Sequence, residues 1–312
     1  MHESNSTTRR DFLKASGVAA AGLLVASTDA KEDSDDDMLI IDCHAHIYGE
    51  DEQKYPTIEK PYRPPNGKGT IAHLKQEMKM AGVRFVTAIQ TSTYYRFDNR
   101  FTSDSSRANS AFMAGVVTLD PDNAESCDMM RKYVAEYNVR GMRSIPAKSG
   151  KLDDPGVNAL WETAEELGIV INVLVSRDKR TEVEALARRH PNLRFVIDHC
   201  LNIKAGDDLE PTLRDVMQLA KLPNAHAKLT FIPTGTAQQY PCRDLHDACR
   251  RVVDAFTPQR CVWGSDFPCE LWCPKVSYSQ HLKIFTHELG LDREAKKAIL
   301  GETARRLWFA SK

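Results

Sequence analysis

Short apolar segments alternate with segments of helical period from residue 38 onward, and this alternation restricts the possible folds more than any other feature of the chain. The helical period is clearest in residues 157–167, where Val157, Leu160 and Trp161 share one face. The apolar segments are short and bounded by polar residues, which is typical of buried strands. The chain therefore predicts repeated strand–helix units.

The pattern contains eight predicted strands separated by predicted helices. The strands are expected at residues 38–43, 83–90, 112–118, 139–143, 169–175, 193–198, 224–231 and 260–265. The helices are expected near residues 70–81, 123–137, 155–167, 180–190, 208–221, 243–256 and 276–289, with one or two further helices in residues 292–309. This count predicts an α/β fold, a (β/α)8 TIM barrel with C-terminal helices, spanning residues 38–312.

The main alternative is an open, doubly wound parallel sheet. Such a fold would need a glycine-rich phosphate-binding turn after its first strand. The first strand here leads into Cys43-His44-Ala45-His46, which is not such a turn. The barrel is therefore the preferred interpretation.

The N-terminal segment predicts export. Thr8-Arg9-Arg10-Asp11-Phe12-Leu13-Lys14 resembles the twin-arginine export motif of bacteria, and the uncharged residues 15–27 follow it. We predict a twin-arginine-type signal peptide in residues 1–30, an acidic spacer in residues 31–37, and a periplasmic location. The twin-arginine export machinery is the expected partner during targeting. No apolar run reaches the roughly 18 residues that span a bilayer, so no membrane anchor is expected after signal cleavage.

The charge balance argues against nucleic acid as the main partner. The 312 residues carry 42 basic and 43 acidic side chains, and the basic ones form no dense stripe. A small-molecule substrate is the expected partner instead.

Polar residues occur where the predicted strands end, which is where a TIM barrel has its active site. His44 and His46 are two positions apart, so on a strand both imidazoles point to one face. The other candidates at strand ends are Gln90, Arg143, His199, Lys228 and Asp266. Their convergence at one barrel mouth would form a site able to bind a metal or transfer protons.

These residues resemble motifs of the amidohydrolase superfamily. Asp42-x-His44-x-His46 comes after the first strand, His199 after the sixth, and Gly264-Ser265-Asp266-x-Pro268 after the eighth. Arg140-Gly141-Met142-Arg143 and Trp263-Gly264-Ser265-Asp266 are most similar to the amidohydrolase-related branch, in particular to lactonases such as 2-pyrone-4,6-dicarboxylate lactonase. The resemblance covers about residues 38–309 and implies a TIM-barrel hydrolase.

The chain departs from the metal-dependent members of this superfamily at the fifth strand. Those members usually place a histidine at its end, where this chain has Leu174. A binuclear metal site is therefore not expected. Two interpretations remain open, one divalent metal ion with zinc preferred, or catalysis without a metal, for which the resembled branch has precedents. The candidate metal ligands are His44, His46, His199 and Asp266.

Chemical roles follow from the residue types and the resemblance. Asp266 is the candidate general base that takes a proton from water. His199 could ligate a metal or polarise the substrate, and without a metal the imidazoles could donate hydrogen bonds to a developing oxyanion. Arg143 could bind a substrate carboxylate bidentately, and Gln90 and Lys228 are further substrate-binding candidates. Loop residues 47–69, 91–107 and 231–242 are expected to shape the pocket.

The leading hypothesis is a hydrolase that opens a lactone or a similar carboxylic ester bond, with Asp266 activating water. The alternative is a metal-dependent, non-oxidative decarboxylase of a small aromatic or unsaturated acid. Leu174 counts against it, because such an enzyme would be expected to need the fifth-strand histidine. A second alternative is a non-catalytic exported binding protein, against which the presence of His44, His46, His199 and Asp266 together argues.

Overall fold

The computed structural model describes residue 1 and residues 38–310 of the chain. The signal peptide and the acidic spacer expected in residues 1–37 lie, apart from Met1, outside the described residues. Within residues 38–310, eight parallel strands pair in sequence order from first to last. They are β1 (Ile41–His46), β2 (Phe85–Ile89), β3 (Met113–Thr118), β4 (Val139–Ser144), β5 (Val170–Val173), β6 (Phe195–Ile197), β7 (Ala225–Lys228) and β8 (Cys261–Val262).

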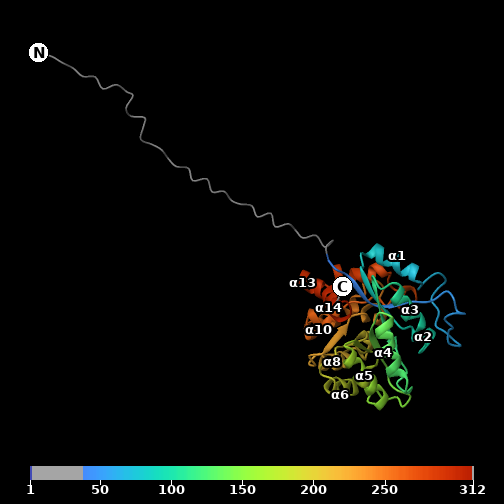
Figure 1. The fold of residues 1–312 in the computed structure, drawn as a ribbon. Coiled ribbons are helices and arrows are strands. Elements are labelled where there is room, and N and C mark those ends of the chain that lie inside the picture. The colour runs from blue at the N-terminus through green and yellow to red at the C-terminus, as the bar shows by residue number, and fades with distance from the viewer. Residues whose placement is uncertain (2–37, 311–312) are drawn as a thin grey trace. The chain divides into compact units, whose positions relative to one another are not determined.

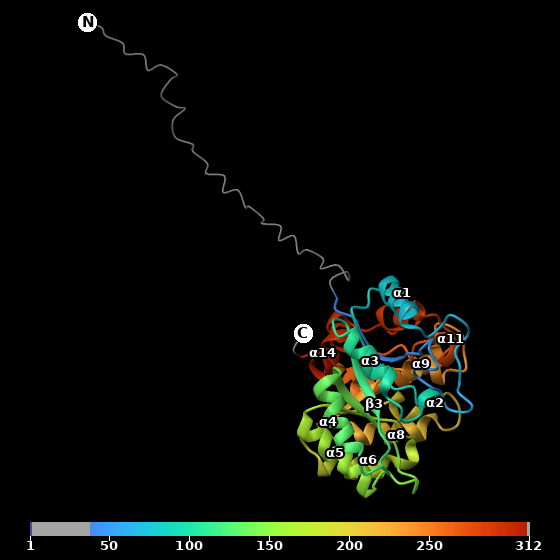
Figure 2. The same cartoon turned by 45° about the vertical axis from the view of Figure 1, so that its right-hand side comes forward.

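Helices connect the parallel strands and surround them, as Figures 1 and 2 show. They are α1 (Ile71–Ala81), α2 (Ser92–Tyr95), α3 (Arg100–Ala108), α4 (Ser126–Glu136), α5 (Pro155–Leu167), α6 (Arg180–Arg189), α7 (His199–Asn202), α8 (Leu209–Leu219), α9 (Phe231–Gly235), α10 (His246–Phe256), α11 (Cys269–Trp272), α12 (Tyr278–Lys283), α13 (Arg293–Lys297) and α14 (Thr303–Trp308). This architecture confirms the predicted (β/α)8 TIM barrel with C-terminal helices. In the part of the chain described, no helix is long and apolar enough to span a membrane.

Helix α5 shows how local sequence determines an element. Its bounds, Pro155–Leu167, are those predicted from the apolar period. The Asp154 side chain accepts a hydrogen bond from the Gly156 backbone N–H at the start of the helix. Gly168 ends it with a φ of 65°, a left-handed conformation that glycine adopts without strain. The buried side of α5 contributes Trp161 to the core between the helices and the sheet.

The observed elements differ from the predicted ones mainly at their ends. β1 extends to His46, so both histidines lie within the strand rather than after it. β7 ends at Lys228, and α9 begins at Phe231, where the prediction still has strand. The segment 91–107, expected as a loop, contains the helix α2 and most of α3.

Helix α3 was not predicted, because apolar residues do not recur along it with the helical period. The side chains it buries are the hydroxyl-bearing Thr102, Ser103, Ser105 and Ser106. Hydrophobic periodicity is the primary signal for a helix in a sequence, and short polar side chains do not provide it. The expected pocket loop 231–242 likewise contains α9, a helix of only five residues.

The barrel closes where β1 meets the segment after β8. The Cys43 backbone N–H donates to the Trp263 carbonyl oxygen at 3.1 Å, and the His46 N–H donates to the Phe267 carbonyl oxygen at 2.8 Å. Ala45 and Phe267 form an isolated parallel bridge beside these bonds. The histidine strand and the residues around Asp266 are therefore held side by side. We call this junction the β1–β8 seam.

The carboxylate of Asp42 crosses the seam. It accepts hydrogen bonds from the backbone N–H of His44 at 3.0 Å and of Ser265 at 2.9 Å. It also accepts from the hydroxyl groups of Ser265 at 2.6 Å and Tyr278 at 2.9 Å. Asp42 is fully buried, and burial raises the pKa of its carboxyl group while these four hydrogen bonds oppose the rise. One carboxylate thus joins β1, the loop after β8 and α12.

Replacing Asp42 with alanine is expected to destabilise the fold by at least about 3 kcal/mol, because it leaves several buried donors without an acceptor. Urea unfolding followed by circular dichroism would measure the loss. The control is Asp254→Ala, which removes an exposed carboxylate of α10 and should change the free energy of unfolding by less than about 0.5 kcal/mol. Equal stabilities for the two variants would show that Asp42 does not hold the seam.

Candidate active site

A cavity of about 290 Å³ opens beside the carboxyl ends of the strands. Its wall contains four residues expected from the sequence, namely His46, Arg143, His199 and Asp266. It also contains polar and aromatic residues that were not individually expected from the sequence, among them Ser92, Thr93, Asn202, Lys204, Thr234 and Trp272. Three of the short helices that carry them, α2, α9 and α11, lie near one another at the right of the barrel in Figure 2.

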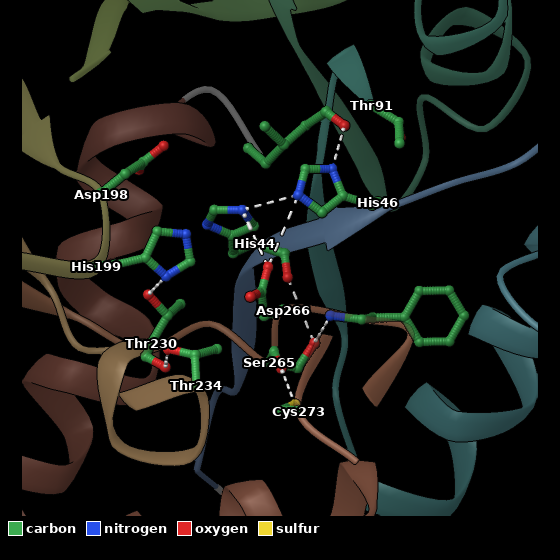
Figure 3. Close-up of polar contacts among 12 residues, drawn as sticks. His44, His46, Thr91, Asp198, His199, Thr230, Thr234, Ser265, Asp266 and Cys273 are labelled. Atoms are coloured by element: carbon green, nitrogen blue, oxygen red, sulfur yellow. Dashed lines mark hydrogen bonds and ion pairs between the residues drawn. The ribbon is translucent and has the colours of Figure 1, made fainter. Parts of the chain in front are cut away.

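Three candidate ligand atoms, from His44, His46 and Asp266, converge beside one another, as Figure 3 shows. The Nε2 atoms of His44 and His46 lie 3.2 Å apart. Asp266 Oδ1 lies 3.3 Å from His44 Nε2 and 3.7 Å from His46 Nε2. His44 is fully buried and His46 is 5% exposed. The two imidazoles therefore point to one spot, as the spacing of two residues on a strand predicts, and the seam brings the Asp266 carboxylate to the same spot.

Hydrogen bonds assign the tautomers of the two imidazoles. His46 Nδ1 lies 3.1 Å from the Ile89 carbonyl oxygen, which accepts only, so Nδ1 carries the proton and Nε2 presents a lone pair. His44 Nε2 lies 2.8 Å from Arg143 Nη2, and it must accept because a guanidinium only donates. Burial lowers the pKa of both histidines well below the ordinary value, and the nearby Arg143 adds to the effect. Both imidazoles are therefore neutral at pH 7.

Left-handed backbone conformations direct two of the other side chains into the site. All four residues of α7 have positive φ, from 47° at Cys200 to 59° at Asn202, and Asp266 has a φ of 56°. Such conformations are uncommon for residues other than glycine and cluster at functional sites. As a result the His199 ring lies 4.8 Å from the His44 ring, measured between centroids.

His199 is held by one hydrogen bond and kept neutral by burial. Its Nδ1 lies 2.7 Å from the Thr230 hydroxyl oxygen. Burial lowers the pKa of His199 to about 4, although the neighbouring Asp198 opposes the shift. One nitrogen of its ring belongs to a group with His44 and Asp266 whose candidate ligand atoms all lie within 4.8 Å of one another.

Asp266 is the carboxylate with the environment of a general base. Burial raises its pKa to about 7, Arg143 opposes the rise, and Asp198 adds to it. Its side chain is 6% exposed and lies in the cavity wall, so a small molecule can reach it. A carboxyl group with a pKa near neutrality can both take and return a proton.

Asp198 is a buried residue that the sequence analysis did not select. Its Oδ2 lies 3.1 Å from Arg143 Nε, and its Oδ1 lies 2.8 Å from Lys228 Nζ and 3.2 Å from Asn172 Nδ2. Burial alone would raise its pKa, but Lys228 and Arg143 outweigh burial and hold the pKa at about 2. Asp198 is therefore a permanent anion that fixes Arg143. Its position directly before His199 at a strand end was the available signal.

Two expected substrate-binding residues lie outside the described cavity wall. Lys228 is fully buried and faces Asp198. Gln90 is also fully buried; its amide donates to the carbonyl oxygens of Arg96 at 3.2 Å and Asp98 at 2.9 Å and accepts from the Thr102 hydroxyl at 2.7 Å. These contacts give Gln90 the role of holding the α2–α3 connection in place.

Leu174 and Trp272 complete the wall with apolar surface. Leu174 lines the cavity directly after β5, where the metal-dependent relatives are expected to carry a histidine. Trp272 packs against the His46 ring at 5.3 Å between centroids and against Tyr62 at 5.2 Å. No motif in the sequence marks Trp272, because α11 has only four residues.

The donor set fits one divalent metal ion in number and spacing. Ligands 2.0–2.1 Å from a tetrahedral zinc ion lie about 3.3 Å from each other. The separations of 3.2, 3.3 and 3.7 Å between the donor atoms of His44, His46 and Asp266 are close to this value. Leu174, which lines the cavity after β5, offers no ligand atom.

Comparison with known proteins decides the family. A family model described as amidohydrolase matches residues 41–310, nearly all of the barrel. The chain belongs to this amidohydrolase family. A second model, the twin-arginine translocation signal sequence, matches residues 6–26, which confirms the predicted export signal.

Individual relatives of this amidohydrolase include a lactonase. L-fucono-1,5-lactonase from Burkholderia ambifaria is 26% identical over 199 residues, covering 62% of this chain and 68% of that protein. The match confirms the resemblance to the lactonases seen in the motifs. Together with the family it identifies the chain as a hydrolase.

Solved structures share the fold at lower identity. A putative 2-pyrone-4,6-dicarboxylic acid hydrolase from Pseudomonas putida has a TM-score of 0.73 and 22% identity, covering 88% of this chain and 99% of its own. An amidohydrolase from Burkholderia multivorans with bound zinc has a TM-score of 0.70 and 23% identity, covering 86% and 99%. A 5-carboxyvanillate decarboxylase from Sphingomonas paucimobilis has a TM-score of 0.60 and 13% identity, covering 87% and 99%. The barrel itself is thus common to hydrolases and decarboxylases.

Gly264 is a residue of the β1–β8 seam that leaves no room for a side chain. A Cβ atom there would lie 2.7 Å from His44 Cβ and 2.9 Å from the His44 backbone nitrogen. We expect Gly264→Ala to force β1 and the loop after β8 apart and to lower the free energy of unfolding by about 1–3 kcal/mol. Urea unfolding tests this expectation, and an unchanged midpoint would show that the seam has room for a methyl group.

Proposed function

We propose that this amidohydrolase opens a lactone or a similar carboxylic ester bond, with Asp266 activating the attacking water. The observation that carries the proposal is the Asp266 carboxylate, placed in the cavity wall 3.3 Å from His44 and 3.7 Å from His46. The hydrolase family and the lactonase relative support the same chemistry.

In this mechanism water attacks the carbonyl carbon of the substrate while Asp266 takes a proton from it. The bond between that carbon and the ring oxygen then breaks, and the proton passes from Asp266 to the leaving oxygen. The product is a hydroxy acid. The His46 Nε2 lone pair can accept a hydrogen bond from the attacking water and so orient it.

Arg143 is suited to bind the substrate oxygen that gains negative charge. Its Nε contacts Asp198 and its Nη2 contacts His44, which leaves Nη1 without a protein partner among residues 38–310. The side chain lines the cavity. We assign Nη1 as a donor to the carbonyl oxygen or to a carboxylate of the substrate, and Lys228 and Gln90 as residues that support the wall.

The same site can work with one divalent metal ion, for which zinc is the preferred candidate. His44, His46 and Asp266 would hold it, with His199 as a further ligand. When bound, such an ion would polarise the substrate carbonyl and lower the pKa of water. The zinc-containing structure from Burkholderia multivorans supports this version, and Arg143 supplies positive charge in the metal-free version.

Export supports a periplasmic site of action. The twin-arginine signal carries the chain across the membrane, and we propose that residues 1–30 are removed and that residues 31–37 form a spacer before the barrel. A small-molecule substrate then reaches the cavity in the periplasm.

The decarboxylase alternative has less support. Structural likeness to a decarboxylase at 13% identity shows the fold alone. Leu174 lines the cavity after β5, where a metal-dependent decarboxylase is expected to need a histidine. A non-catalytic binding protein would have no need to keep a raised pKa on a buried carboxyl group such as Asp266.

Asp266→Asn should keep the fold and lower kcat/KM for a hydrolysed lactone by about 100- to 10,000-fold, the usual contribution of a general base. Asp254→Asn, which changes an exposed carboxyl group of α10 in the same way, should leave kcat/KM unchanged. Steady-state assays on both variants measure the effect. Full activity of Asp266→Asn would remove this residue from the mechanism.

A substrate screen separates the reaction classes. Purified protein is incubated with a panel of lactones and of aromatic and unsaturated acids, while acid production and carbon dioxide release are followed in parallel. We expect hydroxy acid formation from at least one lactone and no carbon dioxide. Carbon dioxide release from an aromatic acid, lost on chelation, would favour the decarboxylase instead.

A further inference from the structure

The guanidinium of Arg143 and a metal ion would need the same lone pair. The imidazole of a neutral histidine has one nitrogen that can accept, and at His44 this is Nε2, which takes the N–H of Arg143 Nη2 at 2.8 Å. The same Nε2 faces His46 and Asp266 in the donor set described above. A metal ligand must present a free lone pair, so His44 Nε2 cannot bind a metal ion while it accepts the hydrogen bond from Arg143.

A buried ion pair keeps Arg143 in this position. Asp198, fully buried, accepts from Arg143 Nε at 3.1 Å. Lys228 of β7 and Asn172 of β5 contact the other carboxylate oxygen of Asp198. These contacts fix the orientation of the Asp198 side chain. Arg143 itself is only 4% exposed. The planar guanidinium of Arg143 is therefore fixed between the Asp198 carboxylate on one side and the His44 imidazole on the other.

The charge balance also favours the guanidinium over an additional ion. Arg143 and Lys228 already supply two positive charges beside the carboxylates of Asp198 and Asp266. A divalent ion added to this buried group would bring two further charges without a new anion, which is costly where water is excluded. Removal of Arg143 would lower that cost and free the His44 lone pair at the same time.

We propose that Arg143 is a built-in competitor of the metal ion, so that a divalent cation binds His44, His46 and Asp266 only when the guanidinium leaves His44. This inference rests on the site assigned in the proposed function, but it concerns cation binding and not turnover. Arg143 thereby sets how tightly the site holds a metal, and Asp198 acts through Arg143 as a positioning residue. The wild-type chain is a weak zinc binder in consequence.

Zinc titration by isothermal calorimetry tests the competition. Wild type and Arg143→Met, freed of metal by chelation and then of chelator, are titrated with zinc alone. Arg143→Met should bind one zinc ion per chain at least about tenfold more tightly than wild type, a change of the size that residues around a metal site produce. Arg131→Met, which removes an exposed arginine of α4, is the matched control and should bind as wild type does.

Two further variants make the outcome specific. Adding His44→Ala to Arg143→Met should abolish the gained affinity, which places the new zinc ion at this site. Arg143→Lys keeps the positive charge but lacks the guanidinium that contacts both Asp198 and His44. Its affinity for zinc should therefore lie between those of wild type and Arg143→Met. If Arg143→Met does not fold, the comparison of Arg143→Lys with wild type is the test. Equal or weaker zinc binding in the folded Arg143 variants, compared with wild type, would overturn the proposal.

Absence of lactone hydrolysis would count against the proposed function alone, since calorimetry requires no turnover.

Discussion

The carboxylate of Asp42 is the constraint on which the site depends. A TIM barrel of eight short strands must close, and here β8 contributes only Cys261–Val262. Asp42 compensates for the short strand, because its four hydrogen bonds join β1, the loop after β8 and α12. The closure places Asp266 against two imidazoles that are far away in the sequence. Asp42, Gly264 and Ser265 thus act in assembling the site, while Asp266 faces the cavity.

A second buried carboxylate, Asp198, organises the positive charge of the site. It holds Arg143 at the cavity wall and is itself neutralised by Arg143 and Lys228. Buried carboxylates therefore have three different environments in one barrel mouth. Asp42 accepts hydrogen bonds from neutral donors, and Asp198 is paired with two cations. Asp266 is the third case, because burial raises its pKa to about 7 although Arg143 and Lys228 oppose the rise.

Much of this arrangement could be predicted from the sequence, because it follows from periodicity. The alternation of strands and helices predicts the barrel, and a spacing of two residues predicts that His44 and His46 share a face. The barrel geometry then predicts that His199 and Asp266 lie at the same mouth, as they do.

Other features depend on side-chain partners that no periodicity encodes. A strand-end position could not show that Gln90 turns toward the carbonyl groups of Arg96 and Asp98 rather than the cavity. The role of Asp198 depends on Lys228, which is 30 residues later and reaches it only through the pairing of β6 with β7. Trp272 lies on a helix too short to have a period. These contacts are set by tertiary packing.

The most direct test of the mechanism is turnover of a lactone substrate in water enriched in the heavy oxygen isotope, with the product analysed by mass spectrometry. Activation of water by Asp266 predicts one heavy oxygen atom in the new carboxylate of the hydroxy acid, and a loss of this incorporation along with turnover in Asp266→Asn. A product that contains no heavy oxygen, or an Asp266→Asn variant that incorporates it at the wild-type rate, would contradict the mechanism.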